Sequence, residues 1–190
     1  MDQGTVAIVS GLPRSGTSMM MRMLEAGGME VLADGLRRAD EDNPSGYYEF
    51  ERVKQIEHDR SWLEYAEGRV VKVISQLLHH LPSDHAYKVV LMRRRMEEIL
   101  ASQQEMLVRR GEATDRVSDE KMAALFRKHL ERVEAWLDDQ PSFEVITVSY
   151  NDVLESPVEE AERISRFFGG ALDVKAMARV VDRKLYRQRR

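Results

Sequence analysis

The stretch TVAIVSGLPRSGTS, residues 5–18, joins a short apolar run to a glycine-rich turn. Its first part, Thr5–Ser10, is rich in β-branched residues, as is typical of a buried strand. Gly11 and Gly16 then bracket the turn, and a helical pattern continues as far as Gly27. Successive backbone N–H groups and a helix dipole converge at such a turn and attract an anion. The stretch therefore predicts a phosphate-binding loop.

The cation of this loop stands in an unusual place. Nucleotide triphosphatases with the same glycine spacing carry a Lys directly after the second glycine, whereas this chain has Thr17 there and Arg14 inside the turn. An ordinary strand–helix turn is the alternative, and it is disfavoured because the motif and its context agree. The methionine-rich run that follows, Met19–Met23, is interpreted as core packing rather than as a cofactor site.

Strands and helices alternate along the rest of the chain. Apolar runs typical of buried strands occur at Val70–Ile74, Lys88–Met92 and Glu144–Val148. Helical patterns begin near Met96, Ser118, Ser156 and Asp173. Continuous apolar strands between helices indicate a parallel sheet covered on both faces. We therefore expect an α/β chain with a three-layer P-loop fold, a central parallel sheet flanked by helices, and a single domain over residues 1–190.

Two further local features of the sequence add to this arrangement. The run Ser156-Pro157-Val158-Glu159 predicts a helix start with an N-cap serine, a proline at the first helical position and a capping-box glutamate. The polar stretch Asp34–Gly46 is the one long irregular segment, and long loops in compact domains are often functional.

Composition excludes several classes of protein. The 190 residues include 29 Lys and Arg, 33 Asp and Glu, and no Cys, so a cysteine nucleophile and a thiolate zinc site are excluded. The formal net charge of −4 argues against a general nucleic-acid or membrane-surface binder. No apolar run approaches the ~20 residues that span a bilayer, and the N-terminus lacks the features of a signal peptide. We expect a cytoplasmic protein, and no feature of the sequence indicates its oligomeric state.

Several segments together carry a resemblance to a known family. Residues 13–18, Pro-Arg-Ser-Gly-Thr-Ser, resemble the 5′-phosphosulfate-binding loop of sulfotransferases, which use 3′-phosphoadenylyl sulfate (PAPS) as the sulfuryl donor. Asn43–Glu49, Tyr150-Asn151-Asp152 and the terminal Leu185–Arg189 are similar to segments of bacterial members. Arg94, with Ser102 eight residues later, is similar to the pair that binds the 3′-phosphate in this family.

The resemblance implies roles for the donor-binding residues. Pro13 and Arg14 belong to the loop, and Arg14 takes the place of the cation that acts on the leaving phosphate. The backbone amides of Ser15, Gly16, Thr17 and Ser18, with the hydroxyls of Thr17 and Ser18, are expected to hold the 5′-phosphate. Arg94 and Ser102 are expected to hold the 3′-phosphate.

Two further residues are candidates for the chemistry. Lys72 lies inside the apolar run at residues 70–74, where an ammonium needs a partner. The resemblance points it at the sulfate oxygens, while an edge-strand lysine that faces water is an equal alternative. The family's common Lys-x-His reads Lys72-Val73-Ile74 here, so that histidine is absent. Glu49 is the preferred general base, with Glu51 as its neighbour, and His79 and His80 come too late to match.

Other readings stay open. The chain is shorter than a typical sulfotransferase domain and shows no late Arg-Lys-Gly stretch, for which Arg187 is a possible replacement. An ATP-dependent P-loop kinase is one alternative, with Asp152 as its only acidic candidate for Mg²⁺. A catalytically inactive nucleotide-binding protein is another. The preferred function is a PAPS-dependent sulfotransferase whose acceptor is a hydroxyl or amine of a small molecule or sugar, with no metal.

Overall fold

The computed structural model describes residues 4–37, 40, 43, 46–112 and 117–181. The strands are β1 (Thr5–Gly11), β2 (Val31–Leu32), β3 (Val70–Lys72), β4 (Ala86–Arg93) and β5 (Phe143–Ser149). The α-helices are α1 (Thr17–Ala26), α2 (Leu63–Ala66), α3 (Met96–Arg109), α4 (Asp119–Asp138), α5 (Tyr150–Glu155), α6 (Pro157–Phe167) and α7 (Val174–Arg179). Two short 3-10 helices, η1 (Glu51–Gln55) and η2 (Ser75–His80), complete the elements of the described residues.

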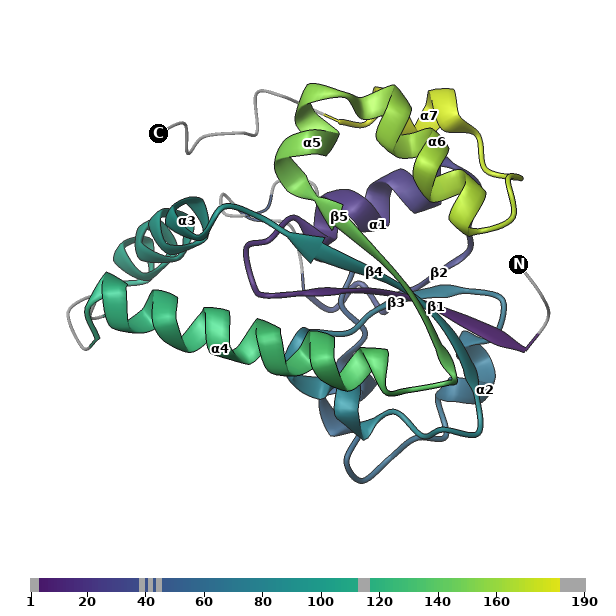
Figure 1. Cartoon of the computed structure of the whole chain (residues 1–190), viewed down its shortest axis with the longest axis horizontal. Helices are drawn as coiled ribbons and strands as arrows, with labels where there is room; N and C mark the ends of the chain where they lie inside the picture. Colours follow the sequence, from purple (N-terminus) through teal and green to yellow (C-terminus); the bar gives the residue numbers. More distant parts are fainter. Residues whose placement is uncertain (1–3, 38–39, 41–42, 44–45, 113–116, 182–190) are drawn as a thin grey trace.

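The strands form one parallel sheet in the order β2-β3-β1-β4-β5. Successive side chains of β1 point to opposite faces, so Ala7 and Val9 belong to one core cluster and Val6 and Ile8 to the other. The first cluster is covered by α1, α5, α6 and α7, and the second by η1, α2, η2 and α4 (Figure 1). This arrangement confirms the predicted α/β fold with a central parallel sheet between two layers of helices.

The strand order places the predicted site residues at one edge of the sheet. In β1, β3 and β4, which are neighbours, the carboxyl ends all point the same way. The glycine-rich loop follows β1, Lys72 ends β3 and Arg94 follows β4. Ligands of open parallel sheets bind at this edge, because there the loops diverge and leave a crevice.

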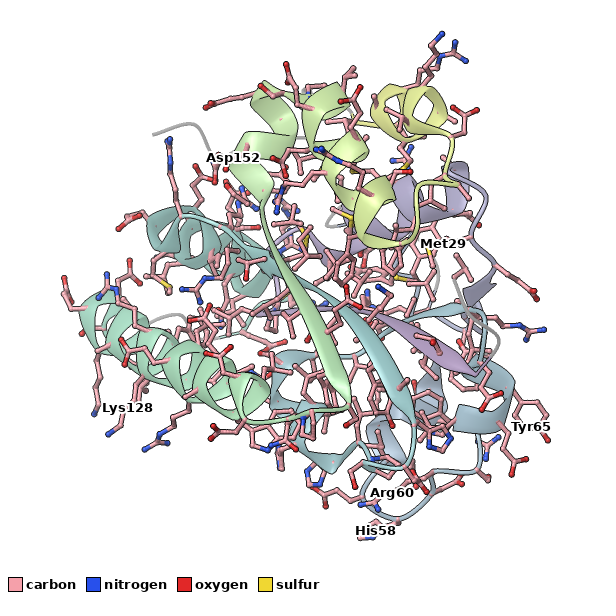
Figure 2. All side chains as sticks on the ribbon, turned by 45° about the vertical axis from the view of Figure 1, so that its right-hand side comes forward. Met29, His58, Arg60, Tyr65, Lys128 and Asp152 are labelled. Atoms are coloured by element: carbon pink, nitrogen blue, oxygen red, sulfur yellow. The ribbon has the colours of Figure 1, made fainter. Side chains whose placement is uncertain are left out.

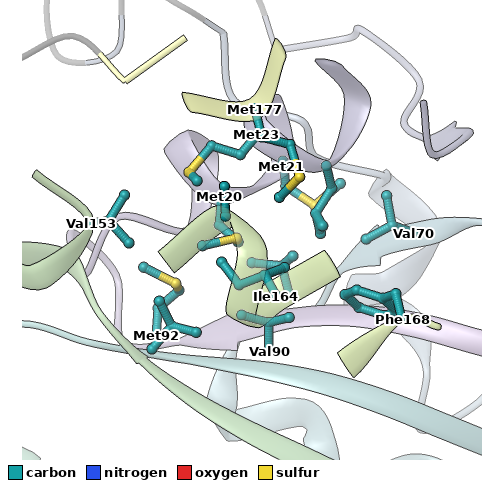
Figure 3. Packing of buried hydrophobic residues seen from close by; sticks show 14 of the residues in the cluster. Met20, Met21, Met23, Val70, Val90, Met92, Val153, Ile164, Phe168 and Met177 are labelled. Atoms are coloured by element: carbon teal, nitrogen blue, oxygen red, sulfur yellow. The ribbon is translucent and has the colours of Figure 1, made fainter. Parts of the chain in front are cut away.

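Methionines fill much of the core beneath α1. Met20, Met21 and Met23 are fully buried and pack with Met92 and Met177 (Figure 3). Unbranched thioether side chains fill irregular gaps between a helix and a sheet. The interpretation of the methionine-rich run as core packing is confirmed.

The structure differs from the predictions in several local features. Strand β2, helices α2 and α5 and the two 3-10 helices were not predicted, because elements of two to six residues are too short to show a periodic pattern. Pro157 does open α6, but the Ser156 side chain makes no capping hydrogen bond. Ser156 also closes α5 with φ −130° and ψ 64°, away from the extended conformation typical of an N-cap residue. The predicted positions of the N-cap serine and of the proline are confirmed, whereas the side-chain hydrogen bond of the predicted capping box is absent.

Candidate functional site

The loop between β1 and α1 is held in a left-handed turn. Arg14 has φ 70° and Gly16 has φ 99°. Only glycine fits at position 16, because a Cβ there would overlap the ring of Tyr150. A left-handed residue other than glycine costs about 1–2 kcal/mol, so Arg14 adopts this conformation only where its surroundings impose it. Its carbonyl oxygen accepts a hydrogen bond from Nη1 of Arg94 at 3.0 Å.

The start of α1 offers the anion-binding amides. Gly16 is the N-cap, so the N–H groups of Thr17 and Ser18 have no carbonyl one turn earlier in the helix to bond. Together with the helix dipole they favour a negative charge at this end. Ser15 differs from its neighbours, because its amide donates to the Leu12 carbonyl at 3.2 Å and its side chain is buried. It supports the turn and does not line the cavity described below.

Arg14 projects from this turn toward α3. Its Nε donates a hydrogen bond to Oγ of Ser102 at 2.9 Å. Both residues line a cavity of about 570 Å³ at the carboxyl edge of the sheet. The structure thus brings together two predicted site residues that are 88 positions apart in the sequence.

Lys72 reaches the same cavity from β3. Its Nζ donates to Oγ of Ser18 at 3.4 Å and to the carbonyl oxygen of Tyr47. Strand β3 lies between β2 and β1, so the alternative of an edge strand is wrong. Burial lowers the pKa of Lys72 from 10.5 to about 8; the negative charge of Glu49 opposes this shift, and the positive charge of Arg37 adds to it.

Glu49 also lines the cavity, next to two cations. Its Oε1 accepts from Nη1 of Arg37 at 2.8 Å, and its Oε2 lies 3.8 Å from Nζ of Lys54. Glu51, by contrast, is exposed, pairs with Lys54 at 2.7 Å and does not line the cavity. Of the two candidate carboxylates, the structure therefore brings only Glu49 to the site.

Arg94 is more enclosed than a surface cation. Its side chain is 8% exposed and its Nε donates to Oε2 of Glu98 at 2.9 Å. Its guanidinium carbon lies 4.4 Å from the centroid of the Tyr150 ring. Arg94 and Ser102 line the same cavity, so the structure brings both members of the predicted pair to one site.

The cavity is strongly cationic. Nine of the ten predicted site residues line it, all except Ser15. Its ionisable lining in the described part of the chain consists of Arg14, Arg22, Arg37, Lys72, Arg94, Arg109 and Arg110, against Glu49 and Glu105. Seven cations against two carboxylates, in a hollow of this size, suit a ligand with more than one negative charge.

Sequence reasoning missed several lining residues. Arg37 lies over the ring of Tyr47, 3.4 Å from its centroid, and the Tyr47 hydroxyl donates to Asp40 at 2.6 Å. Arg37 and Asp40 belong to the polar stretch Asp34–Gly46, and Tyr47 belongs to the segment Asn43–Glu49; neither segment was given a role for these residues. Arg22 follows Ser18 by one helical turn, a spacing that could have identified it. Arg109 lies seven residues after Ser102 on α3, again on the cavity side.

Some predictions fall outside the described residues. Pro44 and Ser45 of the Asn43–Glu49 segment belong to this group, as do the terminal residues 185–189 with Arg187. Within the described residues, Asp152 is exposed at the periphery of the molecule and does not line the cavity (Figure 2). His80 pairs with Glu57 at 2.8 Å, and neither His79 nor His80 lines the cavity.

The described ranges contain neither a candidate metal site nor a membrane-spanning helix. No group of three or more His, Asp or Glu side chains there is arranged to hold a metal ion. None of the helices formed by these residues is long and apolar enough to cross a membrane.

Comparison with known proteins identifies what the chain resembles. The sequence pattern of the sulfotransferase domain matches residues 5–189. A sulfotransferase from Mycobacterium tuberculosis shares 20% identity and a TM-score of 0.56, covering 93% of this chain and 71% of that one. The sulfotransferase domain of the Synechococcus olefin synthase shares 14% identity and a TM-score of 0.57, covering 98% and 80%.

A third solved structure holds a nucleotide. Retinol dehydratase, in complex with androsterone and the inactive cofactor PAP, shares 16% identity and a TM-score of 0.51, covering 95% of this chain and 64% of that one. At these identities the three structures establish the fold. No curated protein is significantly similar in sequence.

Proposed function

The chain belongs to the sulfotransferase domain family and is a sulfotransferase, and on this premise we propose that its donor is PAPS, bound in the cationic cavity beside the glycine-rich loop. One observation carries the proposal: the guanidinium of Arg14 and the ammonium of Lys72 reach the same cavity from two neighbouring strands. PAPS supplies an activated sulfuryl group, which passes to the acceptor as the 5′-phosphate leaves.

The residues of the cavity fit such a donor. The first-turn amides of α1 and the hydroxyls of Thr17 and Ser18 suit the 5′-phosphate. A volume of about 570 Å³ lies within the range of sites that enclose a nucleotide-sized ligand. The excess of arginine and lysine over glutamate offsets the charge of a sulfate and two phosphates.

Each cation has a distinct task. Arg14, from within the loop, stabilises charge that grows on the leaving phosphate oxygen, the place where positive charge helps most. Lys72, on the β3 side, faces the sulfuryl oxygens in its protonated form. Arg94 and Ser102 hold the 3′-phosphate. Replacing Arg94 by Ala is therefore expected to weaken the binding of adenosine 3′,5′-bisphosphate more than the binding of adenosine 5′-monophosphate.

Glu49 is the proposed general base. Its carboxylate lines the cavity, where it can accept the proton of the acceptor, and pairing with Arg37 and Lys54 holds it in place. The acceptor is a hydroxyl or amine of a small molecule or a sugar. The cytoplasmic location and the single domain over residues 1–190 stay predictions.

Nucleotide binding tests the proposal against an ATP-dependent kinase. Adenosine 3′,5′-bisphosphate, the product left when PAPS loses its sulfuryl group, is expected to raise the thermal unfolding temperature more than Mg-ATP at equal concentration. A ligand at 100 times its Kd stabilises the folded state by about 2.7 kcal/mol. Stabilisation by Mg-ATP together with no response to millimolar bisphosphate would overturn the assignment of the donor.

Transfer itself needs a second measurement. Radiolabelled PAPS is offered with a panel of alcohols, amines and sugars, and labelled sulfate is followed to the acceptor. Donor binding without transfer to any member of a broad panel would favour a protein that binds the nucleotide without catalysis.

A further inference from the structure

Behind the glycine-rich loop lies a chain of buried polar side chains. The side chains of Arg94 and Glu98 are 8% and 4% exposed, and Asn151 is 7% exposed. Arg94 directly follows β4, Glu98 lies in the first turn of α3 and Asn151 lies at the start of α5. Polar groups so deeply enclosed are costly unless they are paired with each other. They come from three elements that meet directly beneath the loop.

The three side chains form one continuous set of hydrogen bonds. Asn151 Nδ2 donates to Oε1 of Glu98 at 2.9 Å. The other carboxylate oxygen, Oε2, accepts from Nε of Arg94 at 2.9 Å. Because both oxygens of Glu98 are engaged, the carboxylate fixes the plane of the Arg94 guanidinium.

A second nitrogen of the Arg94 guanidinium, Nη1, is hydrogen-bonded to the glycine-rich loop. Arg94 Nη1 donates to the carbonyl oxygen of Arg14 at 3.0 Å, and Arg14 is the left-handed residue of the turn. The same guanidinium stacks over Tyr150, whose ring packs against Gly16. The network therefore contacts the loop at two residues that set the direction of its backbone.

We propose that Glu98 and Asn151 are positioning residues of the sulfuryl-transfer site, which act through Arg94 to hold the Arg14 peptide in the turn that presents the loop amides to the 5′-phosphate. The inference rests on the proposed function. It also gives Arg94 a task besides contact with the 3′-phosphate, because one nitrogen of its guanidinium is bonded to the loop.

A positioning role of Glu98 and a simple effect of its charge predict opposite changes in the affinity for an anion. Glu98 is a negative charge close to a site for an anion, so Coulomb's law alone predicts that removing its charge tightens anion binding. Loss of the loop geometry has the opposite effect, because amides that point away from the phosphate no longer bind it. The direction of the change in affinity thus separates the two.

The experiment compares three variants of the full chain with the wild type. Glu98→Gln keeps the shape of the side chain and removes its charge. Asn151→Ala keeps the Arg94–Glu98 pair but removes the hydrogen bond that Asn151 donates to Glu98. Glu97→Gln, on the exposed side of the same helical turn, is the matched control. Calorimetry gives the Kd of adenosine 5′-monophosphate and of adenosine 3′,5′-bisphosphate, and steady-state kinetics give kcat and the KM of the acceptor.

The proposal predicts weaker binding of both nucleotides, because both carry a 5′-phosphate. In Glu98→Gln both nucleotides bind roughly tenfold to a hundredfold more weakly and kcat falls, while the acceptor KM stays the same. Asn151→Ala shows a smaller loss of the same kind, and Glu97→Gln shows none. If circular dichroism shows that Glu98→Gln does not fold, the folded Asn151→Ala carries the same comparison.

Other results would overturn the inference. Tighter or unchanged binding of adenosine 5′-monophosphate in Glu98→Gln and Asn151→Ala would mean that the network only supports the fold, although the sulfotransferase site would stand. A wild-type protein that binds neither nucleotide would overturn the proposed function and this inference together.

Discussion

Nε of Arg14 lies 2.9 Å from Oγ of Ser102, so the cation of the glycine-rich loop is hydrogen-bonded to the first half of α3. The bond joins the loop after β1 to the helix after β4 and links residues 88 positions apart. Both residues line the cavity. The hydrogen bond restrains a flexible arginine, as the proposed role of Arg14 at the leaving phosphate requires.

Replacing Arg14 tests this placement. Arg14→Ala and Arg14→Gly both remove the guanidinium, and we expect sulfuryl transfer to fall by about 100- to 1,000-fold in each. Glycine accepts φ 70° without strain, so Arg14→Gly is expected to be at least as stable as Arg14→Ala. Transfer of labelled sulfate and thermal unfolding give the two readouts, and full turnover by either variant would refute the role of Arg14.

Lys72→Met should make stability less dependent on pH. The pKa of Lys72 is about 8 in the folded protein and 10.5 ordinarily, so between these values the unfolded chain holds a proton that the folded chain has lost. Stability therefore rises with pH through this window, and below pH 8 the buried charge costs free energy. At pH 7 we expect Lys72→Met to be more stable by roughly 1–2 kcal/mol, after allowance for the lost hydrogen bond to Tyr47.

The measurement is urea unfolding at pH 7, 8, 9 and 10. The advantage of Lys72→Met is expected to shrink as the pH rises above 8, and Lys128→Met, which changes an exposed lysine of α4, should leave the pH dependence unaltered (Figure 2). Transfer activity is lost in Lys72→Met. An equal pH dependence in the wild type and Lys72→Met would show that the ammonium is not buried in the way described.

Glu49→Gln tests the general base. The amide cannot take a proton from the acceptor, so turnover is expected to fall by about 100- to 10,000-fold while the Kd of adenosine 3′,5′-bisphosphate changes little. Glu51→Gln is the matched control, since Glu51 pairs with Lys54 outside the cavity. Normal acceptor turnover in Glu49→Gln would remove Glu49 from the mechanism.

Gly16→Ala tests the contact between the loop and α5. Both Gly16 and Gly28 have φ 99°, but a Cβ at Gly16 would overlap the Tyr150 ring, whereas nothing lies within 4 Å of one at Gly28. Gly28→Ala should cost about 1–2 kcal/mol of stability from backbone strain alone. Gly16→Ala should cost more and should abolish nucleotide binding. Equal effects of the two substitutions on stability and binding would mean that the Tyr150 contact is unimportant.

Much of the fold is readable from the sequence because its signals are local. The apolar run at residues 5–10, the glycine pair and the proline at position 157 each specify a backbone conformation through their own sterics. Ser118 and Asp173 cap their helices as their positions indicate, with the Asp173 side chain accepting from the Ala176 amide at 2.9 Å. A signal that depends on a neighbouring element is less reliable: Ser156 is the N-cap of α6 as predicted, but it also ends α5 and makes no capping hydrogen bond.

By itself, the amino-acid sequence determined that a strand, a glycine-rich turn and a helix follow one another, and that the turn carries Arg14. Only the tertiary structure decided that β3 is an inner strand, so that Lys72 is buried with a lowered pKa, and that Glu49 rather than Glu51 reaches the cavity. The same holds for Glu98 and Asn151, which lie 53 residues apart and meet beneath the loop. Local conformation follows from bonded neighbours, whereas burial and pairing depend on strand order, which brings distant residues together.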